Sequence, residues 1–507
     1  MRPRLIDRAS QIQNPRSALL LQPLVSDELL DGIDIPVGVR ARNWRLEHEV
    51  HGSSVLSDRV GSTRNFLSTQ VNLVRDEVRD TTWCSIIEGG SLVLVRIDEK
   101  GESRRTIAEN DVWRSHLVLD KFTGEPILCW ITANPDGRAL WFQGELVPTA
   151  THHPDFPFVA LNQVPIGHVQ SSPPSFGILT YKCRDSGRLH YRMFEGRDLG
   201  PEVEVGVQAT VGGLSCAMSE AAVIGRIDAV DGDRVVPMIS LATDRQGVFE
   251  DFEAVELPYT EPFRTMPASG PPTTDFRGHF HVPIAVADEN EAIALDLVLD
   301  EALVEAVTVP TNSPQSSRAV TQAFPKKDGL GRFGDGVSDG LGIIMVALAD
   351  SLLYTSNSQA GGIHFPEKAH LNHEMPKVAA FSSTECYTGG RQPNVVSMDY
   401  VYLEADEEGL PLSRELHFET WDMPLPVPQV TAIAEGSDIT VTIEKDANFE
   451  AGRTTFELDP AVQVRGVEVV DDRHARVRTV GDVRPGQRIG FEVRSRFYHH
   501  HGDAVIT

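Results

Sequence analysis

Residues 112–142 read VWRSHLVLD KFTG EPILCWITA NPDG RALWF and contain the clearest structural pattern in this chain. Three runs of β-branched, leucine and aromatic side chains are separated by two short segments that carry glycine, proline or aspartate. Runs of this length and composition favour β-strands, and the intervening segments favour tight turns. The stretch therefore predicts three antiparallel strands joined by two hairpins.

Six further segments share this order of strand, turn and strand, beginning near Thr82, Ser175, Ala221, Phe280, Leu341 and Pro376. Starting points roughly 40–60 residues apart suit four-stranded sheets arranged in a ring, since ring closure protects the sheet edges. We therefore predict an all-β chain with a six- or seven-bladed β-propeller over residues 41–425. Residues 43–50 are expected to supply a strand to the last blade.

Few segments have a helical pattern. Residues 26–30 and 71–79 are the predicted helical stretches, whereas residues 287–306 fit either a helix or two strands around the turn DENE at 288–291.

Residues 422–428, DMPLPVP, place three prolines within five positions and predict a domain boundary. Short alternating strands follow, so residues 429–507 are predicted to form an immunoglobulin-like β-sandwich. Residues 1–40 contain four prolines and no apolar period, and we expect them to form an extended arm.

The chain has 507 residues and a formal charge of −27. This acidic surplus disfavours binding to nucleic acid and to anionic membrane surfaces. The longest apolar run, residues 343–349, is too short to span a bilayer, and no apolar signal-peptide segment follows the N-terminus. The sequence predicts no membrane insertion and leaves the location open between a virion or other extracellular particle and the cytoplasm.

The cysteine and aspartate patterns do not predict a dedicated metal or redox centre. The five cysteines are widely spaced and mostly apolar in setting, which predicts reduced core thiols. Asp335 and Asp339 in the segment DGVSDG are the candidate metal ligands, with a structural calcium ion as the cofactor they suit, although ordinary turn chemistry explains them better. No other cofactor is expected.

Two segments, TDRQGVF at 243–249 and SNSQAGGIHF at 356–365, resemble the Asp box of sialidase-type propellers. Each has one residue too many before its glycine. The resemblance implies a structural hairpin within a propeller blade. The segment FRTMP at 263–267 only partly matches the opening strand of sialidases, so sialidase activity is not expected.

A second resemblance is to the ulvan lyases, propeller enzymes that cleave polysaccharides. It rests on SFGILTY at 175–181, the turn DSG at 185–187 and LHYRMFEG at 189–196. The resemblance implies that Arg192 neutralises a uronate, with Tyr191 and His190 near the substrate. It also places Phe176 where the family has its catalytic tyrosine. Phenylalanine cannot exchange a proton, so this departure from the family's pattern argues against lyase chemistry.

Histidines are the candidate bases if the chain is an enzyme. His279 and His281 share one face of a predicted strand, and His364 and His370 lie in one loop, but histidine is also common at polar blade ends. The loop YTGGRQPN at 387–394 offers Tyr387 for stacking on a sugar ring and Arg391 for an acidic group. Ligand binding is therefore assigned to Arg192, Tyr387, Arg391 and His364.

These features favour a non-catalytic glycan-binding, adhesion or structural propeller, such as a component of a phage tail or another surface particle. The alternatives are a polysaccharide lyase or glycoside hydrolase that acts on acidic polysaccharide, with Arg192, Tyr191, His190, His279 and His281 at its site, or a protein-binding scaffold. A glycan is the expected partner, and homo-oligomerisation or particle assembly is compatible with this function.

Overall fold

The computed structural model describes residues 49–61, 70–76, 79–109, 111–120, 123–135, 137–162, 176–209, 211–218, 223–231 and 234–242, mainly the strands from residue 249 to 424, and 427–507 with short gaps. Every regular element in this part of the chain is a β-strand, so the prediction of an all-β protein is confirmed. Almost all strand pairs are antiparallel hairpin neighbours, as the alternation of apolar strands and turns predicts.

Seven sheets follow one another through the described part of residues 49–424. Each is built mainly from strands that are consecutive in the sequence. They are sheet 1, β2 (Leu73–Asp76), β3 (Thr81–Glu88), β4 (Ser91–Asp98) and β5 (Gly101–Ala108); sheet 2, β6 (Val112–Leu119), β7 (Pro126–Asn134), β8 (Gly137–Phe142) and β9 (Glu145–Val147); sheet 3, β10 (Pro154–Leu161), β11 (Phe176–Cys183), β12 (Arg188–Glu195), β13 (Asp198–Leu199) and β14 (Val203–Gln208); sheet 4, β15 (Val211–Met218), β16 (Val223–Asp231), β17 (Arg234–Ala242) and β18 (Glu253–Ala254); sheet 5, β19 (Arg264–Thr265), β20 (Thr273–Thr274), β21 (Phe280–Ala287), β22 (Glu291–Val298) and β23 (Leu303–Pro310); sheet 6, β24 (Val320–Pro325), β25 (Ile343–Ala349), β26 (Leu352–Asn357) and β27 (His370–Glu374); and sheet 7, β28 (Val378–Ser383), β29 (Val395–Ala405), β30 (Pro411–Pro424) and β1 (Glu49–Ser57).

Sheet 7 joins the two ends of this series, because β1 pairs with β30. A buried polar cluster, which we call the Asp399 cluster, links sheet 7 to sheet 1. Asp399 on β29 accepts hydrogen bonds from Thr420, at 2.7 Å, and from Thr82, and it forms an ion pair with Arg75 at 3.3 Å. The side chains of Arg75 and Asp399 are 1% and 0% exposed. Their charges are therefore neutralised inside the boundary between the first and last sheets.

Apolar cores fill the spaces between neighbouring sheets. One core joins sheet 7 to sheet 1, and the next ones join sheets 1 and 2, 2 and 3, and 3 and 4. Sheets 1, 2 and 3 therefore bury apolar side chains on both faces, which explains why their strands contain long apolar runs. Members of these four cores are, in the same order, Leu403 and Ile86, Leu94 and Trp130, Leu140 and Tyr181, and Ile178 and Ile227.

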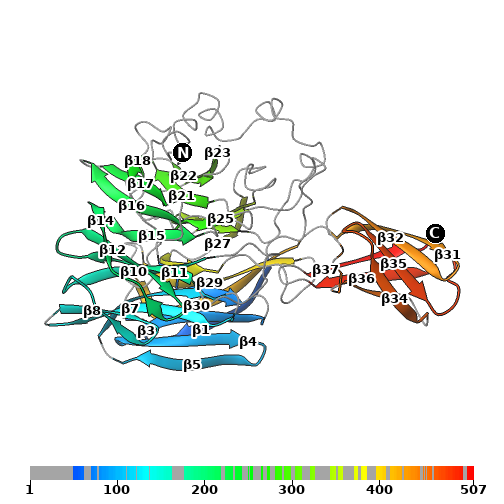
Figure 1. Cartoon of the computed structure of the whole chain (residues 1–507), viewed down its shortest axis with the longest axis horizontal. Helices are drawn as coiled ribbons and strands as arrows, with labels where there is room; N and C mark the ends of the chain where they lie inside the picture. Colours follow the sequence, from blue (N-terminus) through cyan, green and yellow to red (C-terminus); the bar gives the residue numbers. More distant parts are fainter. Residues whose placement is uncertain are drawn as a thin grey trace.

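The C-terminal residues form two sheets with an apolar core of their own. The first has the order β31-β32-β35-β34 and the second β33-β36-β37. Figure 1 shows this part, orange to red, on one side of the other sheets. The strands are β31 (Gln429–Glu435), β32 (Asp438–Lys445), β33 (Thr454–Leu458), β34 (Val464–Val469), β35 (His474–Thr479), β36 (Arg488–Arg494) and β37 (His499–Val505).

Local predictions fared differently along the chain. The three strands predicted in residues 112–142 are confirmed as β6, β7 and β8. The helix predicted over residues 71–79 is wrong, because β2 forms there and pairs with β3, so tertiary pairing overrides the local pattern. Residues 287–306 take the two-strand alternative as β22 and the start of β23. Residues 26–30 and 43–48 lie outside the described residues, while Glu49 and Val50 do pair with β30.

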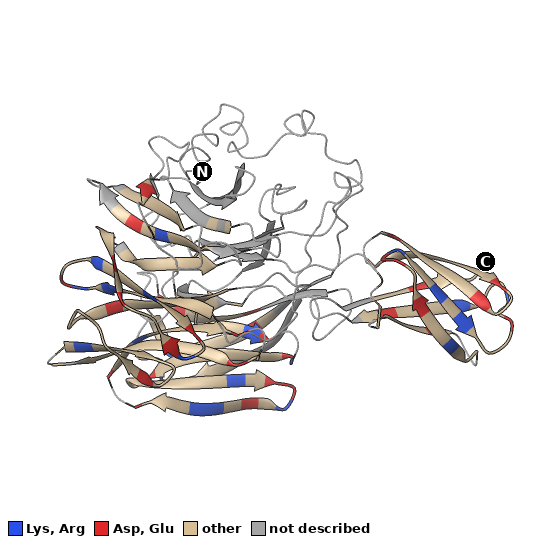
Figure 2. Cartoon of the chain, in the orientation of Figure 1, with Lys and Arg blue, Asp and Glu red and all other residues tan. Residues whose placement is uncertain are grey.

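Figure 2 shows basic and acidic residues interspersed along the strands and turns of both parts. Cys84, Cys129, Cys183 and Cys216 are buried free thiols, as predicted, and Cys386 lies outside the described residues. Across the portion of the chain that the structure describes, we find no helix that combines the length and the hydrophobicity needed to cross a bilayer.

Candidate functional site

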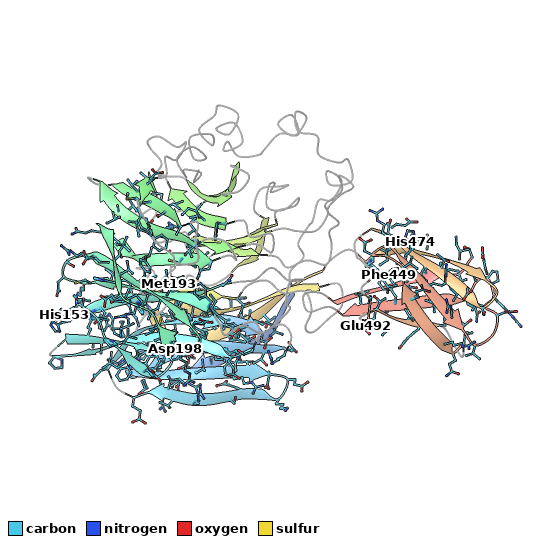
Figure 3. The ribbon with its side chains drawn as sticks, viewed as in Figure 1. His153, Met193, Asp198, Phe449, His474 and Glu492 are labelled. Atoms are coloured by element: carbon cyan, nitrogen blue, oxygen red, sulfur yellow. The ribbon has the colours of Figure 1, made fainter. Side chains whose placement is uncertain are left out.

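His190, Tyr191 and Arg192 are consecutive on β12, so they alternate between the two faces of sheet 3. Tyr191 is 1% exposed and belongs to the core between sheets 3 and 4. Its ring packs edge-to-face with that of Phe249, with 5.4 Å between the two ring centroids. His190 and Arg192 lie on the opposite face, which packs toward sheet 2. The strand therefore separates Tyr191 from the other two predicted site residues. Met193 and Asp198 mark this part of sheet 3 in Figure 3.

Glu202, which precedes β14, brings a group of polar side chains together. Its carboxylate lies 3.0 Å from Nδ1 of His190 and 3.1 Å from Nη2 of Arg192. The backbone N–H of Ala150 also donates to it, at 3.1 Å. Tyr181 on β11 stacks on the His190 ring with 5.2 Å between the centroids. We call Tyr181, His190, Arg192 and Glu202 the Glu202 cluster.

Arg192 is bound mainly to backbone within the chain. Its Nη1 donates to the carbonyl of Gly200 at 2.8 Å, and its Nη2 donates to the carbonyl of Pro148 at 2.7 Å. Pro148 follows β9, so this second bond ties sheet 2 to sheet 3. The Arg192 side chain is only 14% exposed. Its two terminal nitrogens therefore connect the two sheets through protein acceptors, whereas Nε has no hydrogen-bond partner among the described residues.

Tyr181 does not supply a base to this cluster at neutral pH. Burial raises the pKa of Tyr181 above its ordinary value, and the neighbouring Glu202 carboxylate raises it further. The phenol therefore keeps its proton at neutral pH. His116, another strand histidine, is 1% exposed, and burial lowers its pKa to about 3. Its Nδ1 accepts the N–H of Val71 at 3.2 Å, so His116 is a neutral core residue.

The remaining predicted residues are not brought to this cluster. His281 lies on β21 in sheet 5, paired with Val298, and Phe176 opens β11 opposite Glu195. Among the described residues, no group of three or more His, Cys, Asp or Glu side chains gathers as a metal site would require. The residues that lie outside the described part are His279, Tyr387, Arg391, His364, Asp335 and Asp339, together with most of both segments that resemble Asp boxes.

One polar group escaped the sequence analysis. Tyr402 on β29 donates to Glu419 on β30 at 3.0 Å, and Tyr400 donates to the same carboxylate. The side chains are largely buried, and burial together with the Glu404 charge raises the pKa of Tyr402. The available signal was the pattern Tyr-x-Tyr at 400–402, which places both phenols on one face of a strand. Nothing in the sequence indicated that Glu419 lies opposite them.

Comparisons with known proteins give only distant structural similarity. No family model matches the sequence, and no curated protein sequence matches it significantly. The solved structures that it resembles include the polysaccharide lyase Uly1, at 8% identity over 75% of this chain and 100% of that chain, with a TM-score of 0.40. They also include an ulvan lyase described as a new polysaccharide lyase family, at 11% identity over 73% and 95%, with a TM-score of 0.42. The WD40 domain of coronin from Toxoplasma gondii matches at 10% identity over 76% and 87%, also with a TM-score of 0.42.

Proposed function

We propose that sheets 1 to 7 are the blades of a seven-bladed β-propeller over residues 41–425. The pairing of β1 with β30 supports this, because an N-terminal strand that completes the last sheet closes a ring. We also propose that residues 429–507 form an immunoglobulin-like sandwich. Its two sheets have the strand orders ABED and CFG when β31 to β37 are lettered A to G, which is the constant-type arrangement. Residues 1–40 then form an arm that precedes the ring.

We propose that the chain is a non-catalytic propeller protein that binds a glycan or takes part in the assembly of a surface particle, such as a phage tail. The observation that carries this proposal is the bonding of Arg192. The group that a lyase would direct at a uronate donates to two backbone carbonyls and to Glu202. A substrate carboxylate would have to break these bonds. Phe176 at the position of the family's tyrosine removes the proton acceptor as well.

The test is incubation of the purified protein with a panel of acidic and neutral polysaccharides, with absorbance at the unsaturated-uronate band and new reducing ends as readouts. We expect no turnover and retention of one polysaccharide, or of whole cells, on the immobilised protein. Turnover that disappears in Arg192→Ala but persists in Arg188→Ala would overturn the proposal. Arg188 is a suitable control because it lies on the same strand and its ion pair with Glu204 is exposed.

A polysaccharide lyase is the second candidate, and one observation favours it. Tyr181, His190 and Arg192 are gathered around one carboxylate, and Arg192 and Glu202 retain 14% and 16% side-chain exposure. If this site is catalytic, Tyr181 is the proton donor, because its raised pKa keeps it protonated. Tyr181→Phe would then abolish turnover while leaving polysaccharide retention intact. A binding protein would show the same retention in both forms and turnover in neither.

A further inference from the structure

A second polar group lies where sheets 2 and 3 meet, around Asp155 on β10. His153, labelled at the end of the sheets in Figure 3, lies two residues before it. The Oδ1 atom of Asp155 lies 3.0 Å from Nε of Arg114 and accepts the N–H of Phe156 at 2.9 Å. Its Oδ2 atom accepts a hydrogen bond from Nη1 of Arg138. Two guanidinium groups therefore already occupy both oxygens of this carboxylate.

Lys182 on β11 is the cross-strand partner of Asp155 and has no acceptor of its own. The residue is 8% exposed, and within the described part of the chain its ammonium makes neither a hydrogen bond nor an ion pair. Its contact is with the Phe156 ring, whose centroid lies 5.6 Å from Nζ. The guanidinium of Arg114 lies over the same ring at 3.9 Å. Unlike Nε and Nη1 of Arg114, Nζ of Lys182 is accessible to water, and the second cation beside it adds repulsion.

The backbone at Phe156 is strained. Phe156 has φ near +50°, a left-handed conformation that is unusual for a bulky residue, and Pro157 follows it. The strand is irregular there, between Asp155 and Phe158. This conformation holds the half-buried ring against Arg114 and Lys182. Strain of this kind persists where the surrounding structure enforces it and is concentrated at functional sites.

We infer that Lys182, with the Arg114 guanidinium beside it, binds a compact oxyanion, namely a carboxylate or sulfate group. Such an anion replaces water as the acceptor of the Lys182 ammonium and balances the excess of three cations, Arg114, Arg138 and Lys182, over the single Asp155 carboxylate. The anion has two sources, a free ion in solution or the acidic substituent of a polysaccharide. Burial and Arg114 lower the pKa of Lys182, and Asp155 opposes them, so a bound anion also favours the charged ammonium. The inference stands on these contacts and does not depend on the proposed function.

The experiment measures the thermal unfolding midpoint of the full chain against sodium sulfate, with ionic strength held constant by sodium chloride. We expect sulfate to raise the unfolding midpoint of the wild type in a saturable way. In parallel titrations, glucuronate should also raise the midpoint and glucose should not. Lys182→Gln should weaken sulfate binding by about ten- to hundredfold, the worth of a charged hydrogen bond. Lys182→Arg should retain it. Lys100→Gln is the control, because Lys100 is exposed in the β4–β5 turn.

A labelling measurement on the wild type covers the case in which Lys182→Gln does not fold. Sulfate should slow the acylation of Lys182 and leave that of Lys100 unchanged, as read by peptide mass spectrometry. Equal sulfate response in wild type and Lys182→Gln, or labelling of Lys182 that ignores sulfate, would refute the site. Retention of an acidic polysaccharide that survives Lys182→Gln would refute the polysaccharide as the source of the anion and leave the proposed function standing. Sulfate binding without any polysaccharide retention would refute the proposed glycan binding and leave the anion site standing.

Discussion

The Asp399 cluster and the Glu202 cluster both pair arginine with a carboxylate at a boundary between neighbouring sheets, yet they differ in burial. In the first, Arg75 and Asp399 are 1% and 0% exposed. In the second, Arg192 and Glu202 are 14% and 16% exposed. Water can replace a lost partner only where it has access, so the same kind of pair has a different energetic role at each boundary. The buried cluster is a structural closure, and the more exposed one tolerates change.

The largest expected effect tests the buried side of this comparison. Asp399→Ala removes the fully buried carboxylate that pairs with Arg75, leaves Arg75 paired with the partly exposed Asp80, and removes an acceptor from Thr82 and Thr420. Breaking a buried pair in this way should lower the free energy of unfolding by about 3–5 kcal/mol. Denaturant unfolding measures this loss in the free energy of unfolding. Glu102→Ala is the control, because the ion pair of Glu102 with Arg104 is exposed and contributes about 0–1 kcal/mol. Equal losses for both variants would show that burial does not distinguish them.

A pH titration extends the comparison to His116, a buried group that has no charged partner among the described residues. His116 has a folded pKa of about 3, below the ordinary value of 6.5. Above pH 6.5 it is neutral in both states and contributes no pH dependence. As the pH falls from 6.5 toward 3, protons bind the unfolded chain preferentially, so stability falls by at most about 1.4 kcal/mol per pH unit.

The measurement is the free energy of unfolding between pH 7 and pH 4 for the wild type and for His116→Gln. We expect the variant to be less stable at pH 7, since it loses the hydrogen bond with Val71, and to have a shallower pH slope. Identical slopes in the two proteins would mean that His116 is protonated in the folded state or that other groups control the acid response.

The next effect concerns the more exposed cluster. Arg192→Ala removes the donors to Gly200 and Pro148, and we expect a loss of about 1–3 kcal/mol in the free energy of unfolding. This is less than for Asp399→Ala because Glu202 keeps its contact with the Ala150 N–H and retains some exposure. Arg188→Ala on the same strand is the matched control. A larger loss than for Asp399→Ala would reverse the ranking of the two clusters.

The smallest effect is expected at the surface of the C-terminal sheets. Arg478 on β35 lies 3.4 Å from Glu468 and 3.8 Å from Asp438, and all three side chains are more than half exposed. Water and salt screen such pairs, so Arg478→Ala should change stability by about 0–1 kcal/mol, and by less in high salt. A salt-independent loss above this range would indicate that the pairs are coupled to the core of the two sheets.

The sequence predicted the local parts of the fold well. The hairpins of residues 112–142 follow from apolar runs and turn residues that are neighbours in the chain, and the structure has strands there. The helix predicted at residues 71–79 failed because that segment pairs with β3 and with polar groups from other sheets, such as Ser382 at 3.3 Å from the Asn72 N–H. A short segment has too little local preference to resist such partners.

The candidate site likewise has features that the sequence determines and features that only the tertiary structure decides. The sequence analysis grouped Tyr191 with His190 and Arg192, although the period of a strand places Tyr191 on the opposite face from the other two. The bonds that give Arg192 its role come from Pro148, 44 residues away, and from the chain after β13, and no local pattern announces them. The pairing of β1 with β30 and the enclosure of Asp399 likewise required the first and last sheets of the series to meet. Strand and turn identity is a short-range property, whereas closure, burial and the partners of a charge arise from contacts between different strands and loops, up to 324 positions apart for Arg75 and Asp399.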